Sequence, residues 1–211
     1  MSRTEPPDTR ESDAGPTLPG RLGPLFPRDL DPEQMRVLEA MLAGPRGRSG
    51  FLTRERPVAG PFAPWLRSPG FADRAQELGA FVRYRSSLDP RLKELAIIVV
   101  GAAWKAGYEF AAHGPMAIRA GVSREVVEAL ARGETPSFER DDERIVYEFA
   151  TELVENRRVG GERYASAIDL LGESGTVELV GTLGYYTLVC MTLNAFEVPL
   201  GEGMEPPFGA P

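Results

Sequence analysis

Cysteine and histidine are almost absent from this chain. Its 211 residues include one cysteine, Cys190, and one histidine, His113. A single cysteine excludes an intramolecular disulfide, a Cys-x-x-Cys redox pair and a cysteine-rich zinc site. It also favours a reducing compartment. Any histidine chemistry must therefore take place at His113.

Basic charge and long apolar runs are also scarce. The chain has 24 Lys and Arg against 31 Asp and Glu, a net charge of -7, and no basic stripe. Nucleic acid is therefore a poor partner, because phosphate contacts need clustered Lys and Arg. The longest apolar run, from Leu95 to Trp104, is shorter than the ~20 residues that span a bilayer, and the N-terminus has no apolar signal core. We expect a cytoplasmic protein that binds neither nucleic acid nor membrane.

Strand alternation is missing as well, whereas helix signals recur. Asp31-Pro32 and Asp89-Pro90 each place an N-cap residue before a proline at the first helical position. Apolar periodicity and glycine stops then predict an all-α chain of about seven or eight helices. The predicted helices cover about 32–43, 71–84, 90–104, 108–120, 124–131, 141–156, 162–171 and 174–193, with a short element at 62–66 and a loop over 45–60.

The domain organisation follows from composition. Residues 1–28 are rich in Pro, Gly and charged residues, which predicts a flexible arm, although Leu22, Leu25 and Phe26 are able to pin its end. Residues 29–211 then form a single helical domain. Its 42% hydrophobic content is that of an ordinary soluble protein.

Two places in the chain offer acid/base chemistry. Glu109 and His113 are four positions apart, so a helix places them on one face, where a carboxylate can orient the imidazole. Glu94 opens an apolar helix, and burial there would raise its pKa and suit it to proton transfer. The alternatives are a structural Glu–His pair and a solvated first-turn Glu. A metal site is weaker, because these residues reach three ligands only if the fold adds Glu94 to the other two.

Several residues are candidates for holding a substrate. Arg83 and Arg85 carry guanidinium groups that can bind a carboxylate through two hydrogen bonds, or simply be solvated at a helix end. Asn194 is a candidate buried amide in the last helix. Tyr108 and Tyr185 are further candidate substrate contacts, whereas Cys190 reads as inert core.

These segments resemble the carboxymuconolactone decarboxylase superfamily, which includes the alkyl hydroperoxidase D-like proteins. The likeness is strongest over 79–201 and rests on Leu88 to Ala96, Tyr108 to His113, Ala120 to Ser123 and Tyr185 to Phe196. It implies an antiparallel helical bundle that assembles as a homo-oligomer, a trimer or a hexamer. It also brings Glu94 to the Glu109–His113 pair.

The resemblance points to the non-redox branch of that superfamily. The two cysteine positions of the redox branch are Ala106 and Glu109 here, so a thiol peroxidase would lack its nucleophile. The implied activity is a cofactor-free decarboxylation of a carboxylated lactone or related oxygenated acid. His113 would be the acid/base, Glu109 its orienting partner and Glu94 a proton relay, while Arg85 and Asn194 position the substrate. The alternatives are a non-catalytic, oligomeric ligand-binding module and, less favoured, a metal-dependent hydrolase.

Overall fold

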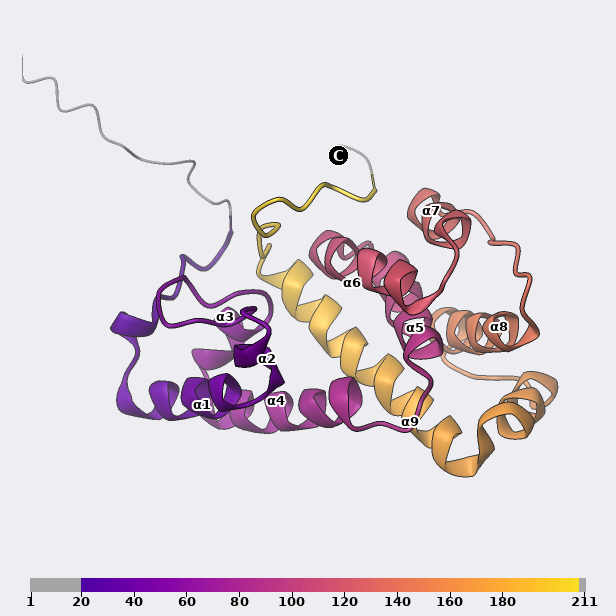
Figure 1. The fold of residues 1–211 in the computed structure, drawn as a ribbon, viewed down its shortest axis with the longest axis horizontal. Helices are drawn as coiled ribbons and strands as arrows, with labels where there is room; N and C mark the ends of the chain where they lie inside the picture. Colours follow the sequence, from indigo (N-terminus) through magenta and orange to yellow (C-terminus); the bar gives the residue numbers. More distant parts are fainter. Residues whose placement is uncertain (1–19, 209–211) are drawn as a thin grey trace, which may run out of the picture.

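The computed structural model describes residues 20–208, and this part of the chain is entirely helical (Figure 1). This confirms the predicted all-α, alkyl hydroperoxidase D-like fold. The elements are a 3-10 turn, η1 (Pro27–Asp29), and the helices α1 (Pro32–Ala43), α2 (Pro45–Arg48), α3 (Phe62–Leu66), α4 (Pro69–Tyr84), α5 (Pro90–Ala103), α6 (Gly107–Ala120), α7 (Arg124–Arg132), α8 (Asp141–Asn156) and α9 (Gly161–Ala195).

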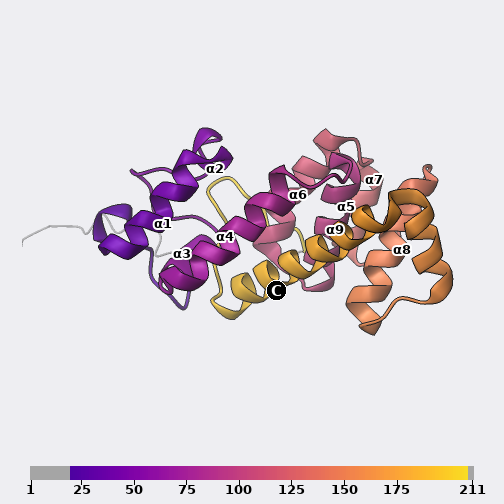
Figure 2. The same ribbon diagram turned by 90° about the horizontal axis from the view of Figure 1, so that it is seen from below.

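The apolar helix α5 is the centre of the bundle. It packs against α6, α8 and α9, and its residues from Leu92 to Gly101 are all buried. Helices α1 to α4 form a second group, which packs onto the bundle through α4 and α9 (Figures 1 and 2). The loop and the short helices between α1 and α4 thereby lie beside one end of α6.

Local sequence signals set the helix boundaries. The Asp31 side chain accepts hydrogen bonds from the backbone N–H groups of Glu33 and Gln34, and the Gln34 side chain completes a capping box. Asp89 caps α5 in the same way, through the N–H groups of Arg91 and Leu92. These caps satisfy backbone donors that have no partner within the helix, and they fix the start of the helix that carries Glu94.

The segment α9 consists of two helices that meet at a kink, as predicted for 162–171 and 174–193. Gly172 interrupts it with a left-handed backbone (φ 69°), a conformation that glycine adopts without steric cost. By length and composition α9 is apolar enough to cross a membrane, but 56% of its apolar window is buried inside the bundle. A core helix of a soluble protein has the same character.

Two segments differ from expectation. Pro45 starts the short helix α2 within the predicted loop of 45–60. Residues 20–28 of the predicted flexible arm lie on the body: Arg21 N–H donates to Phe196 O at 3.0 Å, and Val58 N–H donates to Leu25 O at 2.9 Å. The remainder of the predicted arm, residues 1–19, lies outside the described residues.

Candidate active site

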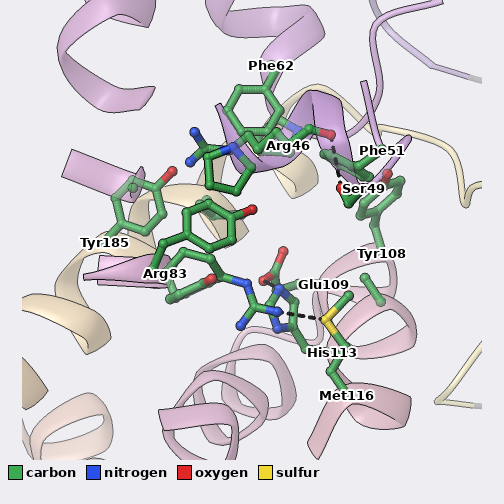
Figure 3. A pocket seen from close by; sticks show the side chains of 17 residues that line it. Arg46, Ser49, Phe51, Phe62, Arg83, Tyr108, Glu109, His113, Met116 and Tyr185 are labelled. Atoms are coloured by element: carbon green, nitrogen blue, oxygen red, sulfur yellow. Dashed lines mark hydrogen bonds and ion pairs between the residues drawn. The ribbon is translucent and has the colours of Figure 1, made fainter. Parts of the chain in front are cut away.

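A cavity of about 260 Å³ lies between the two groups of helices. Its walls come from α2, the loop that follows it and α3 on one side, and from α4, α6 and α9 on the other. Its volume is close to the lower end of the ~300–1,000 Å³ that small-molecule sites occupy. His113, Glu109 and Arg83 all line it, together with several tyrosines (Figure 3).

The His113 imidazole lies between two carboxylates. Its Nδ1 is 2.8 Å from Glu94 Oε2, across from α5. Its Nε2 is 3.1 Å from Glu109 Oε1, one turn earlier on α6. The Tyr186 ring packs edge-on against the imidazole, with 5.2 Å between the ring centroids. The ring is therefore held on both nitrogens and on one face.

Glu94 is the residue that anchors this arrangement. Its other carboxylate oxygen accepts a hydrogen bond from Arg83 Nη1, so one carboxylate binds both a guanidinium and the imidazole. Burial favours a higher pKa for Glu94, but the hydrogen bond and charge of His113, together with Arg83, outweigh burial and lower the pKa. An ionised Glu94 accepts a hydrogen bond from Nδ1–H, which leaves Nε2 facing Glu109.

Glu109 has the opposite electrostatic setting. Its side chain is 5% exposed, and burial raises its pKa despite the nearby charges of His113 and Arg83. The contact with His113 Nε2 is short enough for an ion pair but poorly directed, and Glu109 Oε1 has no hydrogen-bond partner within residues 20–208. A carboxyl group of this kind is suited to keep and deliver a proton near neutral pH.

The two glutamates differ in their position relative to the cavity. Glu109, not Glu94, is the carboxylate exposed to the cavity, because α6 turns both it and His113 toward α4 and α9. Glu94 lies behind the imidazole, outside the cavity lining, where it holds Nδ1.

The predicted substrate contacts divide into two groups. Tyr108 and Tyr185 line the cavity, and burial raises the pKa of Tyr108 to about 12. Arg85 does not line it: this residue follows the end of α4, is exposed, and places its guanidinium over the Phe81 ring. Arg83, two residues earlier and within α4, lines the cavity instead of Arg85.

Asn194 is also outside the cavity. It is exposed rather than buried, and its Nδ2 donates a hydrogen bond to Trp104 O at 2.8 Å. This bond connects the end of α9 to the end of α5, so Asn194 holds these two helices together and does not contact the cavity.

A resident metal ion does not fit these residues. Glu94 and Glu109 lie on opposite nitrogens of the same ring, so the three side chains do not converge on one point. Within the described part of the chain no group of three His, Cys, Asp or Glu side chains is placed to hold a metal ion.

Comparisons with known proteins agree with this geometry. Residues 69–139, which contain Glu94, Glu109 and His113, match the model of the carboxymuconolactone decarboxylase family. This matched segment, about a third of the chain, is similar to that family. No curated protein matches the sequence.

Solved structures show the same fold at low sequence identity. One is a cysteine-to-alanine variant of the debrominase Bmp8 in complex with 2,3,4-tribromopyrrole, at a TM-score of 0.64 and 18% identity, over 85% of this chain and 90% of that one. Another is an uncharacterized peroxidase-related protein from Silicibacter sp. TM1040, at a TM-score of 0.64 and 14% identity, over 86% and 91%.

Within the described residues, the cavity lining contains no cysteine. Ala106 is the N-cap of α6, and Glu109 lies in its first turn. Cys190 is fully buried, and burial raises the pKa of its thiol well above the ordinary value. A thiolate nucleophile would need the reverse shift.

Arg46 and Tyr186 are among the cavity residues that the sequence does not reveal. Arg46 lies in the segment predicted as loop, so no periodicity pointed it inward. Tyr186 is buried in the last helix, and its ring also packs against His113 at the cavity. The adjacent tyrosines Tyr185 and Tyr186 were the available signal.

Proposed function

We propose that this protein is a cofactor-free acid/base enzyme of the cytoplasm that decarboxylates a small carboxylated lactone or a related oxygenated acid. The observation that carries the proposal is the His113 imidazole clamped between Glu94 and Glu109 at the wall of a cavity. The family match and a similar fold that holds a small ring compound support a substrate of this size.

In the proposed reaction, the bond between the substrate carbon and its carboxylate breaks and carbon dioxide leaves. The electron pair moves into the adjacent carbonyl to give an enolate. Glu109, whose pKa is raised by burial, acts as the general acid and donates its proton to that carbon directly or through His113 Nε2. Glu94 accepts a hydrogen bond from Nδ1–H throughout the reaction and stabilises positive charge on the ring. Water then restores the proton.

The geometry favours an enzyme over a non-catalytic ligand-binding module. Such a module requires no alignment of proton donors and acceptors. Here both ring nitrogens lie within about 3 Å of a carboxylate oxygen, at 2.8 and 3.1 Å, beside an open cavity. Two buried carboxyl groups whose pKa values move in opposite directions are the usual arrangement for acid/base work.

A substrate screen tests the proposal. Carboxylated γ-lactones and β-keto acids are incubated with the protein, and carbon dioxide release and deuterium incorporation from D₂O are measured. The variant His113→Ala should reduce turnover by about 10²–10⁴-fold without loss of helicity. Arg85→Ala, which removes an exposed arginine outside the cavity, is the matched control and should leave turnover unchanged. Turnover of a confirmed substrate that survives His113→Ala would contradict the assigned role.

We also propose that the protein is a homo-oligomer. Large apolar side chains are exposed on α4 and α9, among them Phe71, Leu78 and Val177, which is 70% exposed. Such a surface is unusual for a monomer. Size-exclusion chromatography with light scattering should give a mass that is a multiple of the chain mass, and Leu78→Asp should shift it toward the monomer. A wild-type monomer at micromolar concentration would contradict this.

A further inference from the structure

Arg46 is a buried cation at the cavity without a carboxylate partner. The residue is 7% exposed, and within residues 20–208 no Asp or Glu oxygen lies within 4.0 Å of its guanidinium. Its guanidinium makes a long contact of 3.4 Å from Nη1 to Gln76 O and lies next to the Tyr185 hydroxyl, both uncharged partners. Two aromatic rings, Phe62 at 4.9 Å and Tyr84 at 5.7 Å, lie against the guanidinium. Buried charges are ordinarily paired, because desolvation without a partner is expensive.

The other charges at the cavity are already balanced. Arg83 pairs with Glu94. Glu109 and His113 form a pair that is neutral when it holds one proton, whichever of the two carries it. Arg46 brings a further guanidinium to the cavity, and within residues 20–208 no carboxylate is paired with it. Figure 3 shows it beside Phe62, at the opposite end of the cavity from His113 and Glu109.

We propose that Arg46 binds a carboxylate of the substrate and thereby places the rest of that molecule, a small ring, against His113 and Glu109. This rests on the proposed function in taking the cavity as the substrate site. It adds that the substrate is an anion whose charged end is anchored by α2, outside the segment of 69–139 that matches the family.

A carboxylate suits this site better than a phosphate. A planar guanidinium matches the two oxygens of a carboxylate through parallel hydrogen bonds. A phosphate would bring up to two negative charges, and Arg83, the other arginine at the cavity, is already bound to Glu94. The Tyr185 hydroxyl lies beside Arg46, since a Cβ at Gly79 would meet both groups. It offers one further donor to the same anion.

Binding measurements on matched ligands test this inference. The probes are 5-oxotetrahydrofuran-2-carboxylate and its primary amide, which differ mainly in charge, titrated calorimetrically into the full-length protein. Wild type should bind the carboxylate about 10- to 100-fold more tightly than the amide. Arg46→Gln should remove that preference, and Arg46→Lys, which keeps the charge but not the planar fork, should retain part of it. His113→Ala should keep the preference, because the anchor is at the other end.

The outcomes separate the anchor from the reaction. Equal binding of carboxylate and amide by wild type, or an unchanged preference in a folded Arg46→Gln, overturns the inference whatever the turnover. A purely structural Arg46 would give a variant of lower thermal stability with the ligand preference intact, which also overturns it. Charge-dependent binding without any turnover by wild type would uphold the anchor and count against the proposed reaction instead. If Arg46→Gln does not fold, Arg46→Lys and the wild-type ligand pair still decide.

Discussion

Replacing Glu94 by glutamine should destabilise the protein more than any exposed charge substitution. Its carboxylate binds both Arg83 and His113, with side chains that are 7%, 21% and 11% exposed, respectively. Removing one partner from a buried pair costs about 3–5 kcal/mol. The amide of Glu94→Gln keeps a weaker hydrogen bond to Nδ1, and water reaches part of Arg83. We therefore expect a loss of about 2–4 kcal/mol, or ~5–15 °C in Tm for a chain of this size.

Urea denaturation followed by circular dichroism measures this change. Glu39→Gln is the matched control, because Glu39 pairs with Arg54 at 2.5 Å on the exposed surface and should give no measurable change. Adding Arg83→Met to Glu94→Gln should restore stability, since the unpaired buried cation is gone, with a coupling of about 1–3 kcal/mol. A loss below about 0.5 kcal/mol for Glu94→Gln, or strictly additive effects in the double variant, would refute the reasoning.

Further predictions concern pH, proton delivery and the shape of the cavity. The pKa of Glu94 is lowered from its ordinary 4.5, so its contribution to stability is full above pH 4.5 and is lost as the pH falls further. Between pH 5 and pH 3 the urea midpoint should therefore decline less steeply in Glu94→Gln than in wild type. The pKa of Glu109 is raised, so this group contributes stability at acid pH that is lost as pH rises. The stability of Glu109→Gln relative to wild type should therefore be greater at pH 8 than at pH 5. Its kcat should fall by about 10²–10⁴-fold. Gly79→Ala would drive a Cβ into the Tyr185 hydroxyl. The cost of this overpacking, about 1–3 kcal/mol of folding free energy, should exceed the ~1 kcal/mol gained in helix propensity. The same clash should lower kcat/KM. Gains in thermal stability or activity for Gly79→Ala would show that the wall is not tight.

The fold was accessible from the sequence because its signals are local. An N-cap aspartate and the proline after it define the start of a helix within a few residues, and the structure has α1 and α5 beginning at Pro32 and Pro90. The break at Gly172 was equally accessible. The predicted helices 162–171 and 174–193 meet there, and the backbone of Gly172 is not helical (φ 69°, ψ 176°).

The site was only partly accessible, for a related reason. Helical spacing placed Glu109 beside His113, and the structure has them in contact. Which carboxylate faces the cavity depends on how α5 and α6 pack, so the different positions of Glu94 and Glu109 have no signature in the sequence. Arg46 is harder still, because a four-residue helix in a Gly/Arg/Pro segment has no periodicity that would reveal a buried side chain.

The cavity wall combines segments that lie inside and outside the family match. Glu109 and His113 lie within 69–139, whereas the wall from Pro45 to Phe62 and the α9 residues Tyr185, Tyr186 and Val189 lie outside it. Substitutions in the wall can alter which molecule is admitted while the Glu94–His113–Glu109 geometry is left untouched. Divergence within such a lineage would then proceed by changing the recognised compound first and the chemistry last, and laboratory evolution of new substrates should begin with residues 45–62.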